Sequence, residues 1–334
     1  MGDHVFPVLK FGHDSLQNGT LRSCFLYLAV FQEDYVIIDN DLINLWIGEG
    51  FLDEFDNLNE ARNQGHNIIE HLNVACLFES DDDNRIKIHD NKIVVEKDGT
   101  LEAQQILKWK EVKRISLWDI SVEKLAIPPS CPNLITLIFG SVILKTFPYE
   151  FFHLMPIIKV LDLSGTQITE LPVGIDRLVT LQYLNLSYTK LRKLPTELKS
   201  LIRIRCFILD GMPHLKTIPK EEISKLSSLK LFSMQVEGRD HFSQDLDMEL
   251  NYSLEEGKKA HCSSKEEEAA DLWEAKKANY LWQDNKALFE ELAGLEHINE
   301  VSFPIEGALS FEKLMRSQKL QNAMRCLSLG NLDG

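Results

Sequence analysis

One six-residue phrase occurs three times between Ile158 and Leu209. It reads IKVLDL from Ile158, LQYLNL from Leu181 and IRCFIL from Ile204, so its starts lie 23 residues apart. A fixed period of roughly 20 to 29 residues with the pattern Leu-x-x-Leu-x-Leu is typical of a leucine-rich-repeat solenoid. In such a repeat the phrase forms a short strand whose leucines face the stack, because one repeat alone cannot bury them. We therefore expect a parallel sheet with one strand per repeat.

A Leu-Pro phrase separates the strand phrases. It stands at Leu171-Pro172 and again at Leu194-Pro195, each time followed by two further apolar residues. In this class of repeat, the segment after the strand returns along the opposite, convex side of the solenoid. The Leu-Pro phrases therefore predict where the chain turns back.

Weaker copies of the strand phrase extend the array in both directions. They start at Val112, Leu134, Leu229, Ile298 and Met324. Seven or eight units are thus expected, more than the roughly three that a stable stack needs. We assign leucine-rich repeats to residues 112–234, and a helix with the final repeats to residues 288–334.

The residues between and after the strand leucines are expected on the concave face, because successive side chains of a strand point to opposite sides. We predict that they face solvent and bind protein, since aromatic side chains mixed with small polar ones suit protein contact. A solvated face without a partner is the alternative. The residues concerned are Arg114, Ser116, Trp118, Val160, Asp162, Ser164, Tyr183, Asn185, Ser187, Cys206, Ile208 and Asp210.

Residues 235–287 interrupt the period. Over residues 237–291 the sequence has 15 acidic and 7 basic residues. Segments of high net charge and low apolar content do not bury enough surface to pack. We predict an acidic, flexible insertion here.

The overall composition limits the class of protein. The 334 residues leave room for about two domains, and 36 Lys and Arg against 51 Asp and Glu give a net charge of −15, which disfavours nucleic-acid binding. The six cysteines include no C-x-x-C pair, so neither a zinc site nor a disulfide framework is indicated. No apolar run approaches the roughly 18 residues of a membrane span. We expect a cytoplasmic protein without catalytic residues, because the histidines show no nucleophile or metal spacing.

The first ninety residues read as helices followed by a hairpin. Segments 21–31, 41–51 and 59–72 carry apolar residues at helical spacing, and an acidic turn then leads to the alternating strand 85–88. This order predicts a winged-helix module over residues 1–90, with residues 91–111 as a linker. DNA binding is a weak alternative, because Arg62 is the only Arg or Lys of the third helix.

Two segments of this module carry a family resemblance. CFLYLAVFQEDY over residues 24–35 and LINLWIGEGF over residues 42–51 resemble the C-terminal part of the NB-ARC region of plant coiled-coil disease-resistance proteins. Those proteins are intracellular immune receptors. Ile88-His89-Asp90 is similar to the family's Met-His-Asp motif, and the resemblance implies that His89 would contact the phosphates of ADP.

The phosphate loop of the family does not occur in this chain. No G-x-x-x-x-G-K-[ST] is present, so no backbone cradle for phosphates is expected. The sequence resembles a fragment that begins near the end of the nucleotide-binding module, and we expect no cofactor here, although the intact family binds ADP or ATP.

Together these features predict an α/β protein with an N-terminal winged-helix module that is followed by a leucine-rich-repeat solenoid and caps it. The expected function is protein recognition or regulation in plant defence through the concave face. The resemblance implies a pathogen effector, a guarded host protein or the receptor's own nucleotide-binding domain as the partner. An ADP/ATP-dependent switch is the alternative.

Overall fold

The computed structural model describes residues 16, 18–32, 35–74, 79–80, 85–87, 112–118, 130–140, 142–149, 151–212, 214–215, 218, 220–235, 285–305 and 308–329. Three predicted features lie outside these ranges: His89, the linker 91–111, and residues 236–284 of the acidic insertion.

The N-terminal part is a small helical domain with a three-stranded antiparallel sheet in the order β1-β3-β2. The predicted pattern of three helices followed by a hairpin is confirmed. Strand β1 is an addition, because three β-branched residues are too short a run to show a period. The elements are α2 (Gly19–Tyr27), η1 (Leu28–Val30), β1 (Val36–Ile38), α3 (Asp39–Glu49), α4 (Leu58–Val74), β2 (Glu79–Ser80) and β3 (Arg85–Lys87).

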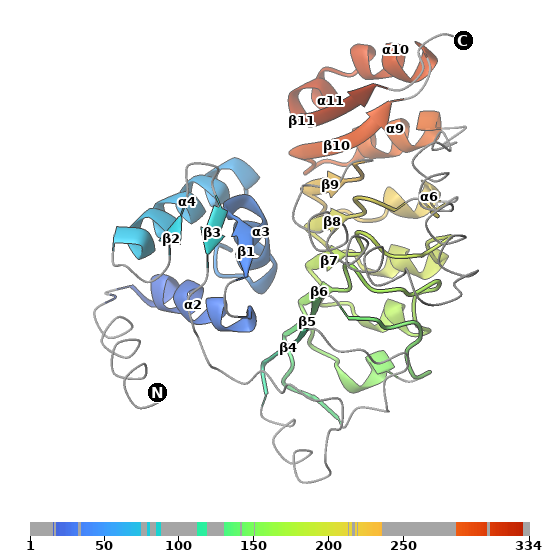
Figure 1. Cartoon of the computed structure of the whole chain (residues 1–334). Coiled ribbons are helices and arrows are strands. Elements are labelled where there is room, and N and C mark those ends of the chain that lie inside the picture. Colours follow the sequence, from blue (N-terminus) through green and yellow to red (C-terminus); the bar gives the residue numbers. More distant parts are fainter. Residues whose placement is uncertain are drawn as a thin grey trace, which may run out of the picture.

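The second part is a solenoid with one parallel sheet of eight strands, which follow each other in chain order from β4 to β11 (Figure 1). The register joins equivalent positions of neighbouring repeats, so Leu161 pairs with Leu184 and Leu184 with Phe207. Each predicted strand phrase is confirmed. The strands are β4 (Arg114–Trp118), β5 (Thr136–Gly140), β6 (Val160–Asp162), β7 (Tyr183–Asn185), β8 (Cys206–Ile208), β9 (Leu231–Ser233), β10 (Glu300–Ile305) and β11 (Met324–Leu329).

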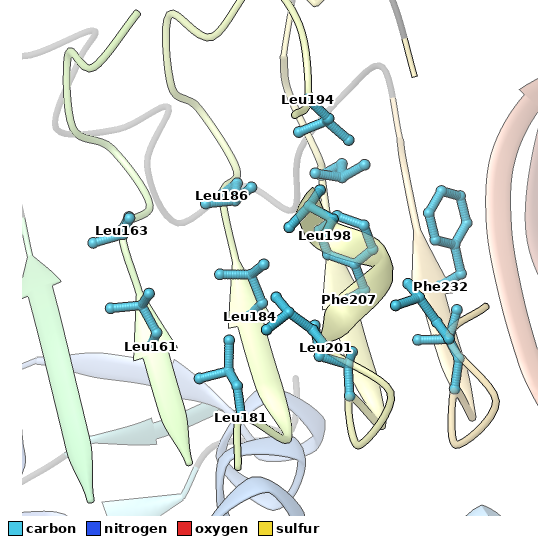
Figure 2. Packing of buried hydrophobic residues seen from close by; sticks show 14 of the residues in the cluster. Leu161, Leu163, Leu181, Leu184, Leu186, Leu194, Leu198, Leu201, Phe207 and Phe232 are labelled. Atoms are coloured by element: carbon cyan, nitrogen blue, oxygen red, sulfur yellow. The ribbon is translucent and has the colours of Figure 1, made fainter. Parts of the chain in front are cut away.

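The solenoid core consists of the leucines of the strand phrase and the apolar residues behind them. Figure 2 shows Leu161, Leu184, Phe207 and Phe232 side by side in successive repeats. All four are 0% exposed. Because the strands of a sheet are about 4.8 Å apart, a 23-residue period places equivalent side chains in direct contact.

Short helical elements cover the opposite side of this core. η3 and η4 follow the Leu-Pro phrases, at which the sequence predicts that the chain turns back. α9 is the helix predicted before the final repeats, and its Leu288 and Leu292 are buried in the solenoid core. The elements of this side are η2 (Phe151–Leu154), η3 (Ile175–Arg177), η4 (Thr196–Ser200), α6 (Lys220–Ile223), α9 (Asn285–Gly294), α10 (Ala308–Arg316) and α11 (Gln318–Ala323).

The winged-helix domain lies beside the strands rather than at one end of the array (Figure 1). We expect from the sequence that it caps the solenoid, and this expectation is wrong. Helix α3 contacts β6 and β7. Apolar residues of the concave face, including Val160 and Tyr183, belong to the same buried cluster as the core of the winged-helix domain. The two domains therefore share a hydrophobic core.

Candidate functional site

The predicted concave-face residues are covered by the winged-helix domain. Of the twelve, Arg114 and Asn185 are half-buried and the other ten are buried. The prediction of a solvent-facing surface is therefore wrong for this arrangement of the chain. The prediction fails because the alternation along a strand shows which side chains point away from the solenoid core, but not which other element covers them. The ten buried residues are Ser116, Trp118, Val160, Asp162, Ser164, Tyr183, Ser187, Cys206, Ile208 and Asp210.

Helix α3 approaches the sheet closely at Gly48. A Cβ atom at this position would lie 2.6 Å from Tyr183 Cβ and 3.1 Å from Val160 Cγ2. Real Cβ atoms do not come so close, so any other residue here would push the helix away from the strands. Gly48 therefore permits the helix backbone to pack directly on β6 and β7.

The next residue, Glu49, anchors the end of α3. Its carboxylate accepts hydrogen bonds from Arg114 Nε at 2.7 Å and Arg114 Nη2 at 3.0 Å, and also from Thr136 Oγ1. Glu49 is 4% exposed. Bidentate pairing with arginine and a third donor satisfy a carboxylate that would otherwise be costly to bury. This contact links α3 to the first two strands of the solenoid.

Arg114 is also held by aromatic rings of the winged-helix domain. Its guanidinium carbon lies 5.6 Å from the ring centre of Tyr27 and 5.5 Å from that of Phe51. Cation–π contacts of this kind are worth about 0.5 to 2 kcal/mol, depending on how far they are removed from water. Arg114 thus binds one carboxylate and two rings of the other domain.

Lys159 contacts the C-terminus of the same helix. Its Nζ donates to the backbone carbonyl of Glu49 at 3.1 Å. The helix ends there because Gly50 adopts the left-handed conformation, with φ of 92°. A cation is favourable at this end of a helix, where backbone carbonyls lack partners.

A second buried ion pair with the opposite polarity joins α4 to β10. Here Arg62 belongs to the winged-helix domain and Glu300 to the solenoid. Arg325 Nη1 donates to the other oxygen of Glu300 at 3.0 Å, and Arg62 Nη2 donates to Asn44 Oδ1 at 3.3 Å. Arg62 is 8% exposed. This arginine is therefore committed to the domain interface and is not placed to meet DNA phosphate.

Two further basic residues contact the loop after α3. Arg205 pairs with Asp53, and Lys230 Nζ donates to the carbonyls of Phe55, at 3.4 Å, and Asp56. Burial, with Arg205 nearby, lowers the pKa of Lys230. These contacts lie at the rim of the interface, since the Asp53 side chain is 45% exposed.

Trp118 fixes the winged-helix domain at the first strand. Its Nε1 donates to the carbonyl of Val30 at 3.0 Å. The ring centre lies 4.7 Å from that of Tyr35 and 6.3 Å from that of Phe31. The side chain is 6% exposed. A buried tryptophan with its N–H satisfied is a typical anchor of a protein interface.

The predicted polar residues of the concave face form hydrogen bonds from repeat to repeat. Asp162 Oδ1 accepts from Ser164 N at 2.9 Å, and its Oδ2 accepts from Asn185 Nδ2 at 3.1 Å. Ser187 Oγ accepts from Asp210 N at 3.1 Å. Burial raises the pKa of Asp162 to about 6, opposed by the hydrogen bonds from Ser164 and Asn185. These residues support the sheet and also face the other domain.

A cavity of about 100 Å³ lies between the two domains. Its walls include Tyr35 and Asp41 of the winged-helix domain and Trp118, Asp162 and Asp210 of the solenoid. Its walls combine apolar and polar side chains, and a cavity of this size with several polar groups has room for water. No lysine, arginine or histidine is among the residues found to line it.

Metal binding and membrane insertion find no support in the part of the chain that the structure describes. Within those ranges no cluster of three or more His, Cys, Asp or Glu residues is arranged to hold a metal ion. None of the helices there combines the length and the apolar content that a bilayer span requires.

Sequence patterns do not reveal the interface role of Glu49 and Arg62, which the winged-helix domain contributes, or that of the basic positions of the solenoid. A signal for the latter exists. Lys159, Arg205 and Lys230 each stand directly after the first residue of a strand phrase. A basic residue repeated at one position of a solenoid marks one continuous face, and this face meets α3 and the loop behind it.

Two family descriptions match this chain, and plant and bacterial proteins are similar to it. The family described as "Disease resistance protein Winged helix domain" matches residues 30–92, and "Leucine Rich Repeat" matches residues 180–201. A probable disease resistance protein of Arabidopsis thaliana is 37% identical over 60% of this chain and 24% of its own length. Disease resistance protein RPS5 of the same plant is 29% identical over 97% of this chain and 34% of its own length. Among solved structures, a leucine-rich-repeat protein of Leptospira interrogans is 26% identical, with a TM-score of 0.37, and the match covers 44% of this chain and 38% of that one.

The two family matches fit the order of the two domains and their location in the chain. The chain spans 24% to 34% of the length of the two plant relatives. It consists of a winged-helix domain of the disease-resistance type and a leucine-rich-repeat array, and it is a homologue of plant disease resistance proteins.

Proposed function

We propose that this chain acts in plant defence as a protein-binding regulatory unit. The concave face of its repeats holds the winged-helix domain, and a partner protein gains access to that face only when the domain leaves. The names of the relatives support the role in disease resistance. The proposal contains no catalytic step.

One observation carries the proposal: the concave face and the winged-helix domain form one buried cluster that is framed by ion pairs. Trp118, Tyr183 and Ile208 are the kind of side chain that dominates binding energy at protein interfaces. All three are at most 8% exposed. Two buried pairs of opposite polarity, Glu49 with Arg114 and Arg62 with Glu300, fix the register of the contact. Such pairs favour one mode of docking over others.

Cys206 offers a direct test, because it lies on the concave face and is 0% exposed. Burial raises the pKa of this thiol to about 12, so it does not react with an alkylating reagent while the domains are docked. Cys131 in the solenoid core and Cys24 in the winged-helix core are also 0% exposed and serve as internal controls. Peptide mass spectrometry reads the alkylation of each cysteine separately in the intact chain.

Glu49→Arg places two like charges together in the interface. Removing one partner of a buried ion pair costs about 3 to 5 kcal/mol, so alkylation of Cys206 is expected to accelerate by roughly 100-fold or more. Cys131 and Cys24 should react as slowly as before, and the double variant Glu49→Arg/Arg114→Glu should restore part of the protection.

Two outcomes contradict the proposal. If Cys206 stays protected in Glu49→Arg, the domains are not held by this contact. If all three cysteines become reactive together, the substitution unfolds the chain. The interface is then part of the structural core and not a contact that opens and closes reversibly.

A further inference from the structure

Asp162 occupies an unusual place, at the end of β6 and directly under the winged-helix domain. Its carboxylate is held by Ser164 N and Asn185 Nδ2, and the residue is 8% exposed. It lines the cavity between the domains together with Asp41 of α3. None of its hydrogen-bond donors is charged, in contrast to Glu49 and Glu300, which accept hydrogen bonds from arginines.

The groups that face Asp162 from the surrounding elements do not neutralise it. Asp41 on α3 is a second carboxylate, and Asn44 on the same helix is neutral. The solenoid adds Tyr183 on β7 and, two repeats further, Asp210 after β8. Docking of the winged-helix domain therefore brings a carboxylate out of water and closer to another one.

The physical consequence is a preference for the neutral form in the docked arrangement. Burial is the main cause that raises the pKa of Asp162 from 3.8 to about 6, and the charge of Asp41 is a smaller cause in the same direction. When the domains separate, water replaces α3 above β6, and both causes weaken.

We propose that Asp162 makes the docking of the winged-helix domain on the repeats proton-dependent, so that mild acid favours the docked arrangement. This inference rests on the proposed function, since protons can shift docking only if the two domains separate and return.

The sign and the size of the effect follow from linkage. The docked form binds the proton more tightly than the separated form, so acid favours docking, and the gain is lost as the pH rises through about 6. With a pKa of about 6 in the docked form and the ordinary value of 3.8 in the separated form, the docking constant is expected to be about fourfold higher at pH 5.5 than at pH 7.5. Above pH 7 little of the effect remains.

Trp118 provides a reporter for both arrangements. Its Nε1 donates to Val30, and its ring contacts Phe31 and Tyr35, so separation of the winged-helix domain changes the surroundings of the indole. The full chain is labelled with 5-fluorotryptophan, and the ¹⁹F signal of Trp118 is assigned through the Trp118→Phe variant. The substitution Glu49→Gln weakens docking, so that both the docked and the separated signal become measurable. Their ratio is recorded between pH 5.5 and 7.5.

Three variants isolate the contribution of Asp162. In the Glu49→Gln background, Asp162→Asn should remove the pH dependence and keep the domains docked at both pH values. Asp41→Asn should move the rise in docking to lower pH, because one of the causes of the raised pKa is gone. Glu197→Gln neutralises an exposed carboxylate on η4, far from α3, and should leave the fourfold change intact.

The outcomes separate this inference from the proposed function. If the Glu49→Gln chain shows only one Trp118 signal at every pH, the domains do not separate, and both proposals fail. If two signals appear but their ratio does not change with pH, or changes equally in Asp162→Asn, Asp162 does not make docking proton-dependent, while the proposed function stands.

Discussion

The two sides of the solenoid sheet are stabilised in different ways. The inner side, which faces the solenoid core, consists of periodic apolar residues such as Leu161, Leu184 and Phe207. Each of them contacts its equivalent in the next repeat. The concave side combines apolar residues with ion pairs such as Arg114–Glu49 to the winged-helix domain. The inner side can lose its contacts only if the repeats unfold, whereas on the concave side water can replace the winged-helix domain.

The largest effect is expected from a large-to-small substitution on the inner side. Phe207→Ala removes a ring that is 0% exposed and lies 5.9 Å from the ring of Phe232. Such substitutions cost about 3 to 5 kcal/mol of unfolding free energy. Urea unfolding followed by circular dichroism measures the loss. Ile202→Ala, at a site that is 50% exposed, is the control and should change stability by less than about 0.5 kcal/mol. Equal losses in both variants would contradict the assignment of the inner side as the core.

A smaller loss, of a different kind, is expected from the buried ion pair of α4. Arg62→Ala leaves Glu300 with Arg325 as its remaining partner. The cost should be about 3 kcal/mol, the lower end of the range for breaking a buried pair, because Glu300 is still partly neutralised. It should appear as exposure of Cys206 to alkylation, with Cys131 still protected. Arg316→Ala breaks an exposed pair with Glu312 and is the control. A general loss of protection would show that the pair stabilises the whole chain and not the docked state.

The contrast between the two sides also explains what the sequence can predict. Leu161 and Leu184 are found because the same position repeats every 23 residues. The concave positions follow from the alternation of a strand, but their solvent exposure does not, because the covering helix comes from another domain. Glu49 and Arg114 are 65 residues apart, and Arg62 and Glu300 are 238 apart. No local pattern connects such pairs, and only the repeated basic position of Lys159, Arg205 and Lys230 gives a hint.

Gly48 should give an intermediate effect that is confined to the concave side. Gly48→Ala places a Cβ atom against Tyr183, while the core of the winged-helix domain stays intact. Overpacking of this kind costs about 1 to 3 kcal/mol. Cys206 alkylation should accelerate while Cys24 stays protected. Gly19→Ala is the matched control, because a Cβ atom there meets no other atom within 4 Å. Unchanged protection of Cys206 in Gly48→Ala would mean that α3 does not pack on β7 as closely as the structure shows.

The smallest effect is expected at the rim, from Asp53→Ala. The side chain of Asp53 is 45% exposed and that of its partner Arg205 is 23% exposed, so water and salt screen the pair. Exposed ion pairs contribute about 0.2 to 1 kcal/mol. The acceleration of Cys206 alkylation should be at most about fivefold at low ionic strength. It should disappear in about 0.5 M salt, because salt screens the attraction between Asp53 and Arg205 in the parent chain, so that the substitution has nothing left to remove. The effect of Arg62→Ala should persist under the same conditions, since its partner is buried. If the acceleration in Asp53→Ala persists in high salt, Asp53 belongs to the buried contact. Docking would then depend on the repeated basic residues of the solenoid as well as on the two buried ion pairs.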